Sequence, residues 1–244
     1  MKITLADSEN RNALGGELLT QFDEALDSAN ADPAIRAVVV TNEGNTFCAG
    51  ANLKERAGAA APSRPSISFD ALLEKIQTSA TPVIGQIDGH VVGGGNGLAA
   101  AFDISVACED VKFGFTEVRL GVVPAIISVV CLPKMNRGNA MDAFLRGNRF
   151  SATRAAAMGL INYAVPGDQL ESAVDEIVSD IAKGGPNAVS VAKQLVNEVP
   201  AMDQKDAFAK MAKLSAELFS GDEAKGGMRA FLKKEKAPWA SEDS

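Results

Sequence analysis

Three consecutive glycines, Gly93-Gly94-Gly95, lie between a strand-like segment and a run of small residues typical of a helix. Glycine lets the backbone approach a ligand closely and adopt conformations that other residues rarely adopt. The first N–H groups of a helix have no intrahelical partner and suit an anion. The segment therefore predicts backbone donors for an anion or a developing oxyanion, while tight packing of the helix alone explains the same glycines. It matches neither a Walker loop nor a dinucleotide fingerprint.

A second loop of small residues, 46–53, follows the β-branched segment 35–41. Both loops come at the carboxyl ends of predicted strands, where ligands gather in parallel sheets. Each loop could supply one N–H group to the same carbonyl oxygen. The two loops together predict an oxyanion hole made only of main chain.

Glu117 is an acid within the otherwise apolar segment 113–124. If the side chain is buried, lost solvation raises the pKa of its carboxyl toward the working pH, as a proton shuttle requires. The alternative is an exposed carboxylate that pairs with Arg119 or with a helix end. Composition alone leaves both possibilities open.

The elements that position these residues follow from hydrophobic periodicity. Apolar residues at helical spacing predict a helix over 17–30, and β-branched segments predict strands over 35–41, 81–88 and 103–107. Strands that alternate with helices indicate an α/β fold with largely parallel pairing. The segment 56–66, rich in Ala, Pro and Ser, is expected to be a mobile surface loop.

The pattern changes after about residue 150. A capped helix start is predicted at Ser151 and a short strand over 160–165. Nearly everything that follows is expected to be helical, over 168–183, 187–198, 203–220 and 222–234. We therefore expect an α/β core over 1–165 and a helical region over 166–244.

Composition excludes several classes of protein. The 244 residues carry 24 Lys+Arg against 31 Asp+Glu, a formal net charge of −7, which argues against a nucleic-acid-binding surface. No apolar run reaches the roughly 18 residues of a membrane span. The three widely spaced cysteines are expected to be reduced thiols in the cytoplasm. The single histidine argues against a metal site with several histidine ligands. We expect no metal, no nucleic acid and no membrane partner.

Three motifs in order resemble the crotonase superfamily, the enoyl-CoA hydratases and isomerases. They are FCAGANL at 47–53, IDGHVVGGGNGLAAAFDISVA at 87–107 and FGFTEVRLGVVP at 113–124. The likeness extends to Arg11-Asn12-Ala13-Leu14 and to the segment 228–239, and so covers nearly the whole chain. It implies a crotonase-like α/β spiral of ββα units whose C-terminal helical region mediates trimerisation. The implied assembly is a homotrimer or homohexamer.

The resemblance also implies roles for individual residues. Ala49 and Gly94 match the two backbone donors to the thioester carbonyl, and Glu117 matches the glutamate that protonates the α-carbon. The remaining matches are positions that bind the CoA or acyl part of the substrate: Gly50, Ala51, Asn52, Leu53, Phe231 and Lys234. The last two reach CoA from a neighbouring subunit in some relatives. Coenzyme A is then part of the substrate, and no separate cofactor is expected.

One departure from the family pattern concerns Gly97, which stands where typical hydratases carry a first glutamate. With Glu117 alone, proton transfer between carbons, as in Δ3,Δ2-enoyl-CoA isomerases, is the more economical chemistry. Bacterial relatives with the same Gly-plus-Glu pattern nevertheless resemble hydratases. We expect an enoyl-CoA hydratase, with the isomerase as the alternative and a non-catalytic acyl-CoA-binding paralogue as the rival from another class.

Overall fold

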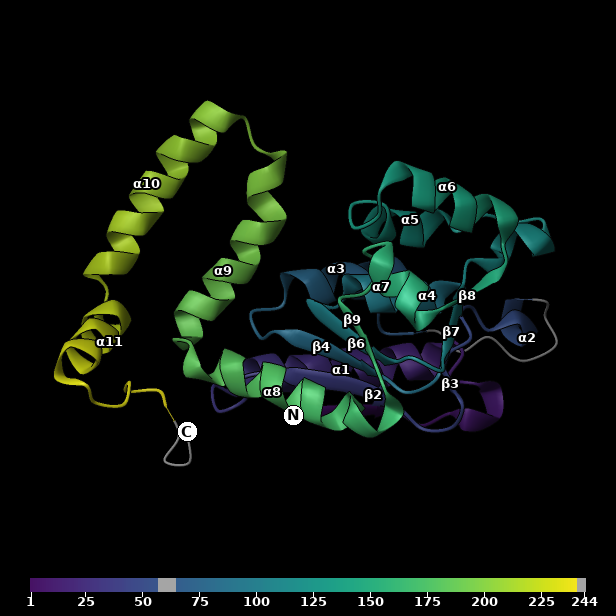
Figure 1. Cartoon of the computed structure of the whole chain (residues 1–244), viewed down its shortest axis with the longest axis horizontal. Helices are drawn as coiled ribbons and strands as arrows, with labels where there is room; N and C mark the ends of the chain where they lie inside the picture. The colour runs from purple at the N-terminus through teal and green to yellow at the C-terminus, as the bar shows by residue number, and fades with distance from the viewer. Residues whose placement is uncertain (57–64, 241–244) are drawn as a thin grey trace.

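Two β-sheets, wound by a repeating strand–strand–helix path, form the body of the protein (Figure 1). The computed structural model describes residues 1–56 and 65–240, so most of the predicted loop at 56–66 lies outside the described residues. The larger sheet has the order β1-β2-β4-β6-β9 and is parallel throughout. Its strands are β1 (Lys2–Leu5), β2 (Val38–Asn42), β4 (Val83–Ile87), β6 (Ile104–Cys108) and β9 (Tyr163–Val165).

The smaller sheet has the order β3-β5-β7-β8 and is parallel except for its last pair. Its strands are only three residues long: β3 (Thr46–Cys48), β5 (His90–Val92), β7 (Lys112–Gly114) and β8 (Arg149–Ser151). Three successive turns of the chain, β2-β3, β4-β5 and β6-β7, each place one strand in each sheet before a helix follows. The predicted α/β class and crotonase-like spiral are therefore confirmed, with five strands that the sequence did not predict: β1 and the four of the smaller sheet.

The helices of the body come between and after these strands. They are α1 (Gly16–Ala31), α2 (Leu53–Arg56), α3 (Phe69–Thr78), α4 (Gly94–Ala101), α5 (Ala125–Cys131), α6 (Arg137–Arg146) and α7 (Ala152–Ala157). The Ser151 side chain accepts a hydrogen bond from the Arg154 N–H, so the predicted helix cap is confirmed. In α4, small residues leave almost every position buried, and the helix can pack closely against α5.

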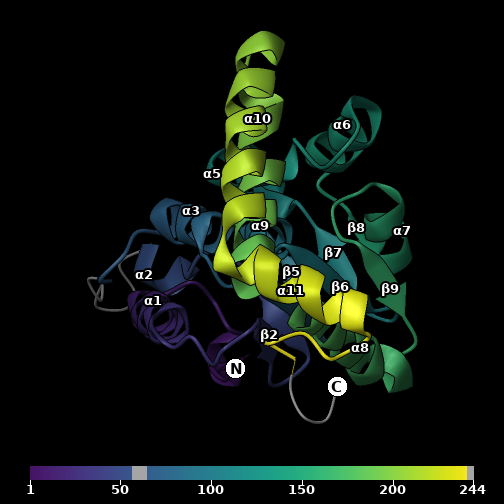
Figure 2. The ribbon, with the colours of Figure 1, turned by 90° about the vertical axis from the view of Figure 1, so that its left-hand side faces the viewer.

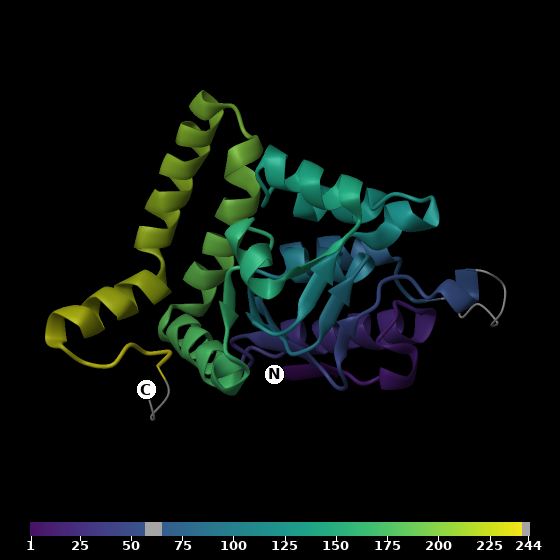
Figure 3. The ribbon, with the colours of Figure 1, turned by 45° about the vertical axis from the view of Figure 1, so that its right-hand side comes forward.

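The C-terminal third is helical, as predicted: α8 (Leu170–Lys183), α9 (Pro186–Glu198), α10 (Gln204–Ser220) and α11 (Asp222–Lys233). Leu170 and Val174 of α8 are buried in the core, and the helix lies along β4 and β6. Helices α9 to α11 instead extend from the body as an arm (Figures 2 and 3). In the described part of the chain, no helix is long and apolar enough to cross a membrane.

A buried ion pair joins the arm to the body. The Lys193 ammonium on α9 lies 2.8 Å from Asp103 Oδ2 and donates to the Ile76 carbonyl at the end of α3. Asp103 Oδ2 also accepts from the Val83 N–H at 2.7 Å. Burial raises the pKa of Asp103 and lowers the pKa of Lys193, so for both groups desolvation outweighs their mutual attraction. Removing either partner alone would therefore leave a buried charge without its counter-charge and destabilise the fold.

We expect Lys193→Met to lower the free energy of unfolding by about 3 kcal/mol, because it leaves the Asp103 carboxylate in the interior without its ion-pair partner. Urea unfolding of the parent and the variant measures this loss. Combining the change with Asp103→Asn should restore part of the stability, since the buried charge is then gone. A loss below about 1 kcal/mol, the range of an exposed pair, would contradict a buried anchor.

Candidate functional site

The two glycine-containing loops meet at the start of α4. Gly93, with φ +55°, caps the helix, and Gly50, with φ +83°, lies against it. A Cβ added to Gly50 would lie 2.8 Å from the Gly94 nitrogen and 3.0 Å from the Val92 carbonyl oxygen. Only glycine fits this left-handed backbone at so close an approach. The structure thus brings Gly50 and Gly94 together. The Gly94 N–H has no acceptor within α4, because it belongs to the first turn of the helix.

Ala49, the other predicted donor, uses its N–H group within the fold. It donates to the Arg11 carbonyl at 3.1 Å, because Arg11 and Asn12 adopt left-handed conformations that turn this carbonyl toward β3. Among the described residues, the Ala51 N–H has no hydrogen-bond partner, and Ala51 follows Gly50 directly. These contacts favour Ala51 over Ala49 as the second backbone donor beside Gly94.

Glu117 lies beside this pair of donors. It belongs to the 3-10 helix η2 (Thr116–Leu120), and its Oε1 is 3.5 Å from the place where a Cβ on Gly93 would be. Its Oε2 is buried without a hydrogen-bond partner among the described residues. Desolvation by burial raises the pKa of the Glu117 carboxyl, as the sequence predicts for a buried acid. No ion pair links Glu117 to Arg119 within the described part of the chain.

The position of the absent first glutamate is filled by an apolar side chain. A Cβ added to Gly97 would lie 2.3 Å from Ile127 Cγ2 and 3.5 Å from Leu73 Cδ1. Ile127 belongs to α5 and is 3% exposed. Gly97 therefore lets α5 pack closely against α4. The side chains of Ile127 and Leu73 form an apolar wall where the carboxyl of a second acid would be. The sequence showed that Gly97 departs from the family pattern but not which residue replaces the lost side chain.

A cavity of about 440 Å³ opens beside the loop at 46–53. Ala49, Leu53 and Val92 line it together with three basic side chains, Arg11, His90 and Arg149; Asn45 and Thr46 complete the lining. Neither arginine forms an ion pair with a described residue, although the chain as a whole is acidic. The cavity is thus suited to an anionic ligand, and it adjoins the predicted CoA-binding loop. The sequence did not identify either arginine as a binding residue, because the two come from distant segments of the chain.

The other predicted binding residues divide into two groups. Asn52 Oδ1 accepts from the Lys54 N–H and its Nδ2 donates to Glu55, so this side chain organises α2. Phe231 and Lys234 lie at the end of α11 on the arm, far from α2 and α4 (Figure 3). Phe231 is 82% exposed. The structure does not bring these two residues to the Glu117 site within one chain.

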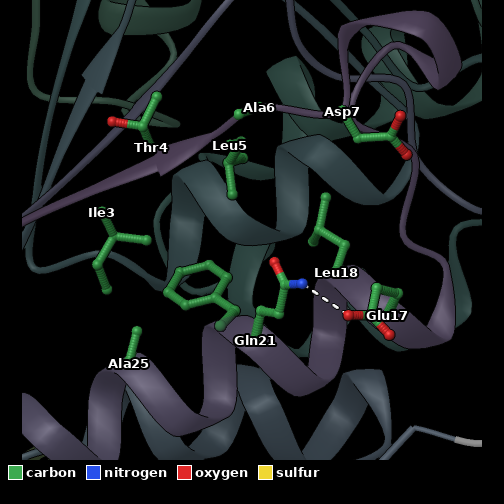
Figure 4. Close-up of a pocket in the computed structure, with 10 residues that line it drawn as sticks. Ile3, Thr4, Leu5, Ala6, Asp7, Glu17, Leu18, Gln21 and Ala25 are labelled. Carbon is green, nitrogen blue, oxygen red and sulfur yellow. Dashed lines mark hydrogen bonds between the residues drawn. The ribbon is translucent and has the colours of Figure 1, made fainter.

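A second cavity, of about 430 Å³, lies between β1 and α1 (Figure 4). Ile3, Leu5 and Phe22 contribute apolar side chains, and Gln21 donates a hydrogen bond to Glu17 across the helix surface at 2.6 Å. None of the predicted site residues lines it. Within the described residues, no group of three His, Cys, Asp or Glu side chains could hold a metal ion.

Comparisons with known proteins agree with the observed fold. The model of the enoyl-CoA hydratase/isomerase family matches residues 1–242. Enoyl-CoA hydratase EchA19 of Mycobacterium tuberculosis is 33% identical over 243 residues, which cover 95% of this chain and 90% of the relative. AtuE of Pseudomonas aeruginosa superposes with a TM-score of 0.90 at 29% identity, covering 98% of this chain and 95% of its own. An enoyl-CoA hydratase from Bacillus anthracis gives a TM-score of 0.87 at 29% identity, with 99% and 95% coverage. The chain belongs to the enoyl-CoA hydratase/isomerase family.

Proposed function

We propose that the protein adds water across the double bond of an enoyl-CoA thioester. The observation that carries the proposal is the convergence of the Gly94 N–H, the loop at Gly50 and Ala51, and the Glu117 carboxyl at the start of α4. Preorganised backbone donors stabilise an oxygen on which negative charge develops, and a half-buried acid beside them can move a proton. The hydratases among the relatives support the same reaction class.

In the proposed reaction, the thioester oxygen accepts hydrogen bonds from the Ala51 and Gly94 N–H groups. Water forms a C–O bond at the β-carbon, and the π electrons move to give an enolate whose charge rests on that oxygen. Glu117, as the carboxylate, takes a proton from the attacking water as the C–O bond forms and then delivers that proton to the α-carbon. Each backbone donor contributes about 3 kcal/mol to transition-state stabilisation by analogy with other oxyanion holes.

We place the nucleotide end of coenzyme A in the cavity beside this loop. Its phosphates carry negative charge, and arginine binds phosphate with two parallel hydrogen bonds. Arg11 and Arg149 line the cavity without other charged partners among the described residues. Their positions support an acyl-CoA substrate independently of Glu117.

Isomerisation is the second candidate, and Ile127 is the observation that favours it. With Ile127 over Gly97, Glu117 is the one carboxyl near the donors in the described part of the chain. One carboxylate suffices to remove the α-proton of a 3-enoyl thioester and return it to the γ-carbon, because no water has to be activated.

A panel of enoyl-CoA thioesters that differ in chain length and double-bond position tests the proposal. Products are identified by liquid chromatography and mass spectrometry. A 3-hydroxyacyl-CoA from a 2-enoyl substrate supports hydration, whereas interconversion of 3-enoyl and 2-enoyl thioesters without gain of water supports isomerisation. Thioester binding without any turnover would replace both proposals with the non-catalytic acyl-CoA-binding protein.

The apolar wall makes a specific prediction about Gly97→Glu. Because its side chain would enter the space of Ile127, the single variant is expected to lose about 1–3 kcal/mol of stability, with Gly97→Ala as the control for the clash alone. Combining Gly97→Glu with Ile127→Ala makes room for the carboxyl. We expect this double variant to hydrate crotonyl-CoA faster than Ile127→Ala does. Equal rates in two folded proteins would show that the second carboxyl does not limit hydration.

We also propose that the chain assembles as a trimer or a dimer of trimers through its arm. Helices α9 to α11 bury few side chains and expose large apolar ones, among them Phe208, Phe219, Phe231 and Leu232. An exposed apolar surface of this kind is typical of an interface. Light scattering should give three or six times the chain mass, and a monomer would contradict the proposal.

A further inference from the structure

Asn96 is a fully buried polar residue in an otherwise small-residue helix. Its side-chain Nδ2 donates to the Gly93 carbonyl at 3.0 Å and to the Gly114 carbonyl at 2.9 Å. The Gly93 N–H donates to the same Gly114 carbonyl at 3.0 Å. One amide group therefore holds the start of α4 and the end of β7 together.

We infer that Asn96 is a positioning residue that aims the Gly94 N–H at the thioester oxygen and ties it to Glu117. The Gly93 carbonyl and the Gly94 N–H belong to one peptide group, which is planar and points them in opposite directions. Fixing the carbonyl oxygen therefore fixes the direction of the N–H. The Gly93 oxygen is held twice, by Asn96 Nδ2 and by the Asn96 backbone N–H at 2.9 Å.

The second bond of Asn96 reaches the other half of the site. Gly114 ends β7, three residues before Glu117, and its carbonyl is the shared acceptor for Asn96 and Gly93. The Gly93–Gly94 peptide and the segment that carries Glu117 are thus both held at the Gly114 carbonyl. A displacement of about 1 Å in such a site can lower a rate by about 100-fold.

An asparagine at position 96 lowers the stability of the fold, so packing alone does not explain its presence. Asn96 Oδ1 is buried without a hydrogen-bond partner among the described residues, and a buried unsatisfied oxygen destabilises the fold. Leucine, of similar size, would fill the same volume without that cost. The two hydrogen bonds donated by Nδ2 account for an asparagine at this position.

The inference rests on the proposed function, and two variants test it. Asn96→Leu keeps the volume and removes both donated bonds, so kcat is expected to fall by about 10- to 100-fold while KM stays near the parent value. Ser105→Ala is the matched control, because the buried Ser105 hydroxyl donates to the Ala99 carbonyl at the other end of α4. It removes a buried hydrogen bond to the same helix and should leave kcat unchanged. Parental kcat in folded Asn96→Leu, or an equal loss in Ser105→Ala, overturns the inference.

The second variant, Asn96→Asp, should have a kcat that depends on pH in a way that a purely structural role for Asn96 would not produce. The introduced carboxyl can donate a hydrogen bond only when it is protonated, so its kcat relative to the parent should fall as the pH rises through its pKa. The same ratio for Asn96→Leu should be independent of pH. Cys48, Cys131 and Glu117 are the titratable groups that face this segment, and both thiols stay neutral because burial raises their pKa values. Dividing by the parent rate removes the pH dependence that the two proteins share. A flat ratio for Asn96→Asp overturns the inference.

A measurement on bound butyryl-CoA separates this inference from the proposed reaction. This saturated thioester cannot be hydrated, and the infrared stretch of its ¹³C-labelled carbonyl moves to lower frequency when N–H groups donate to it. We expect that shift in the parent and in Ser105→Ala, and a smaller shift in Asn96→Leu. An equal shift in all three overturns the role of Asn96 even if the enzyme is active. A parent that shows the shift but converts no enoyl thioester overturns the proposed reaction and leaves the role of Asn96 supported.

Discussion

Replacing Glu117 with glutamine is expected to lower kcat for enoyl-CoA hydration by about 100- to 10,000-fold. Glutamine keeps the size of the side chain and one carbonyl acceptor but cannot release and recover a proton. The backbone donors and the cavity lined by Arg11 and Arg149 remain, so binding of the CoA thioester should change little. Steady-state kinetics and a binding titration with butyryl-CoA measure the two effects separately.

Glu109→Gln is a suitable control, since Glu109 is an exposed glutamate on the same chain. The pH profile gives a second test of Glu117. Burial raises its pKa above the ordinary value of 4.5, so a step that needs the carboxylate should lose rate on the acidic side at a pH above 4.5. This acidic limb should be absent in Glu117→Gln. Full activity in the glutamine variant would mean that another group moves the proton.

Gly94→Pro should lower turnover by about 100-fold or more, because proline has no N–H to donate to the thioester oxygen. Gly94 is the first residue of α4, and helices accept proline at this position. Circular dichroism should therefore show a folded protein, and the loss should lie in kcat.

Gly94→Ala is the matched control because it keeps the N–H group. A Cβ at this position would first meet Leu14 Cδ1, the end of a flexible side chain, so the alanine variant should retain far more activity than the proline variant. Equal turnover of Gly94→Pro and the parent would remove the Gly94 N–H from the mechanism.

Much of the fold could be predicted from hydrophobic periodicity. The buried strands β2, β4 and β6 and the four C-terminal helices agree with their predicted segments to within a few residues. The strands of the smaller sheet were missed because three residues are too few to show alternation, and β3 and β5 lie within segments rich in turn-forming residues. Their positions depend on pairing with distant strands.

The sequence predicted the kind of site, backbone donors beside an acid, but not every group that contributes to it. Glu117 and Gly94 were identified from their neighbours in the sequence, and the structure brings them together. Whether the Ala49 or the Ala51 N–H lacks a partner among the described residues depends on the left-handed turn at Arg11 and Asn12, which sequence spacing does not reveal. Asn96 did carry a signal, since it is the one polar residue in a helix of Gly, Ala and Leu.

Deuterium incorporation tests the central claim most directly, because the account assigns the α-proton to Glu117. Crotonyl-CoA is incubated with the protein in D₂O, and the 3-hydroxybutyryl-CoA formed is analysed by mass spectrometry. The account predicts that the parent produces this thioester with deuterium at the α-carbon, and that Glu117→Gln incorporates it at least about 100-fold more slowly. Incorporation by Glu117→Gln at the parental rate would contradict the account.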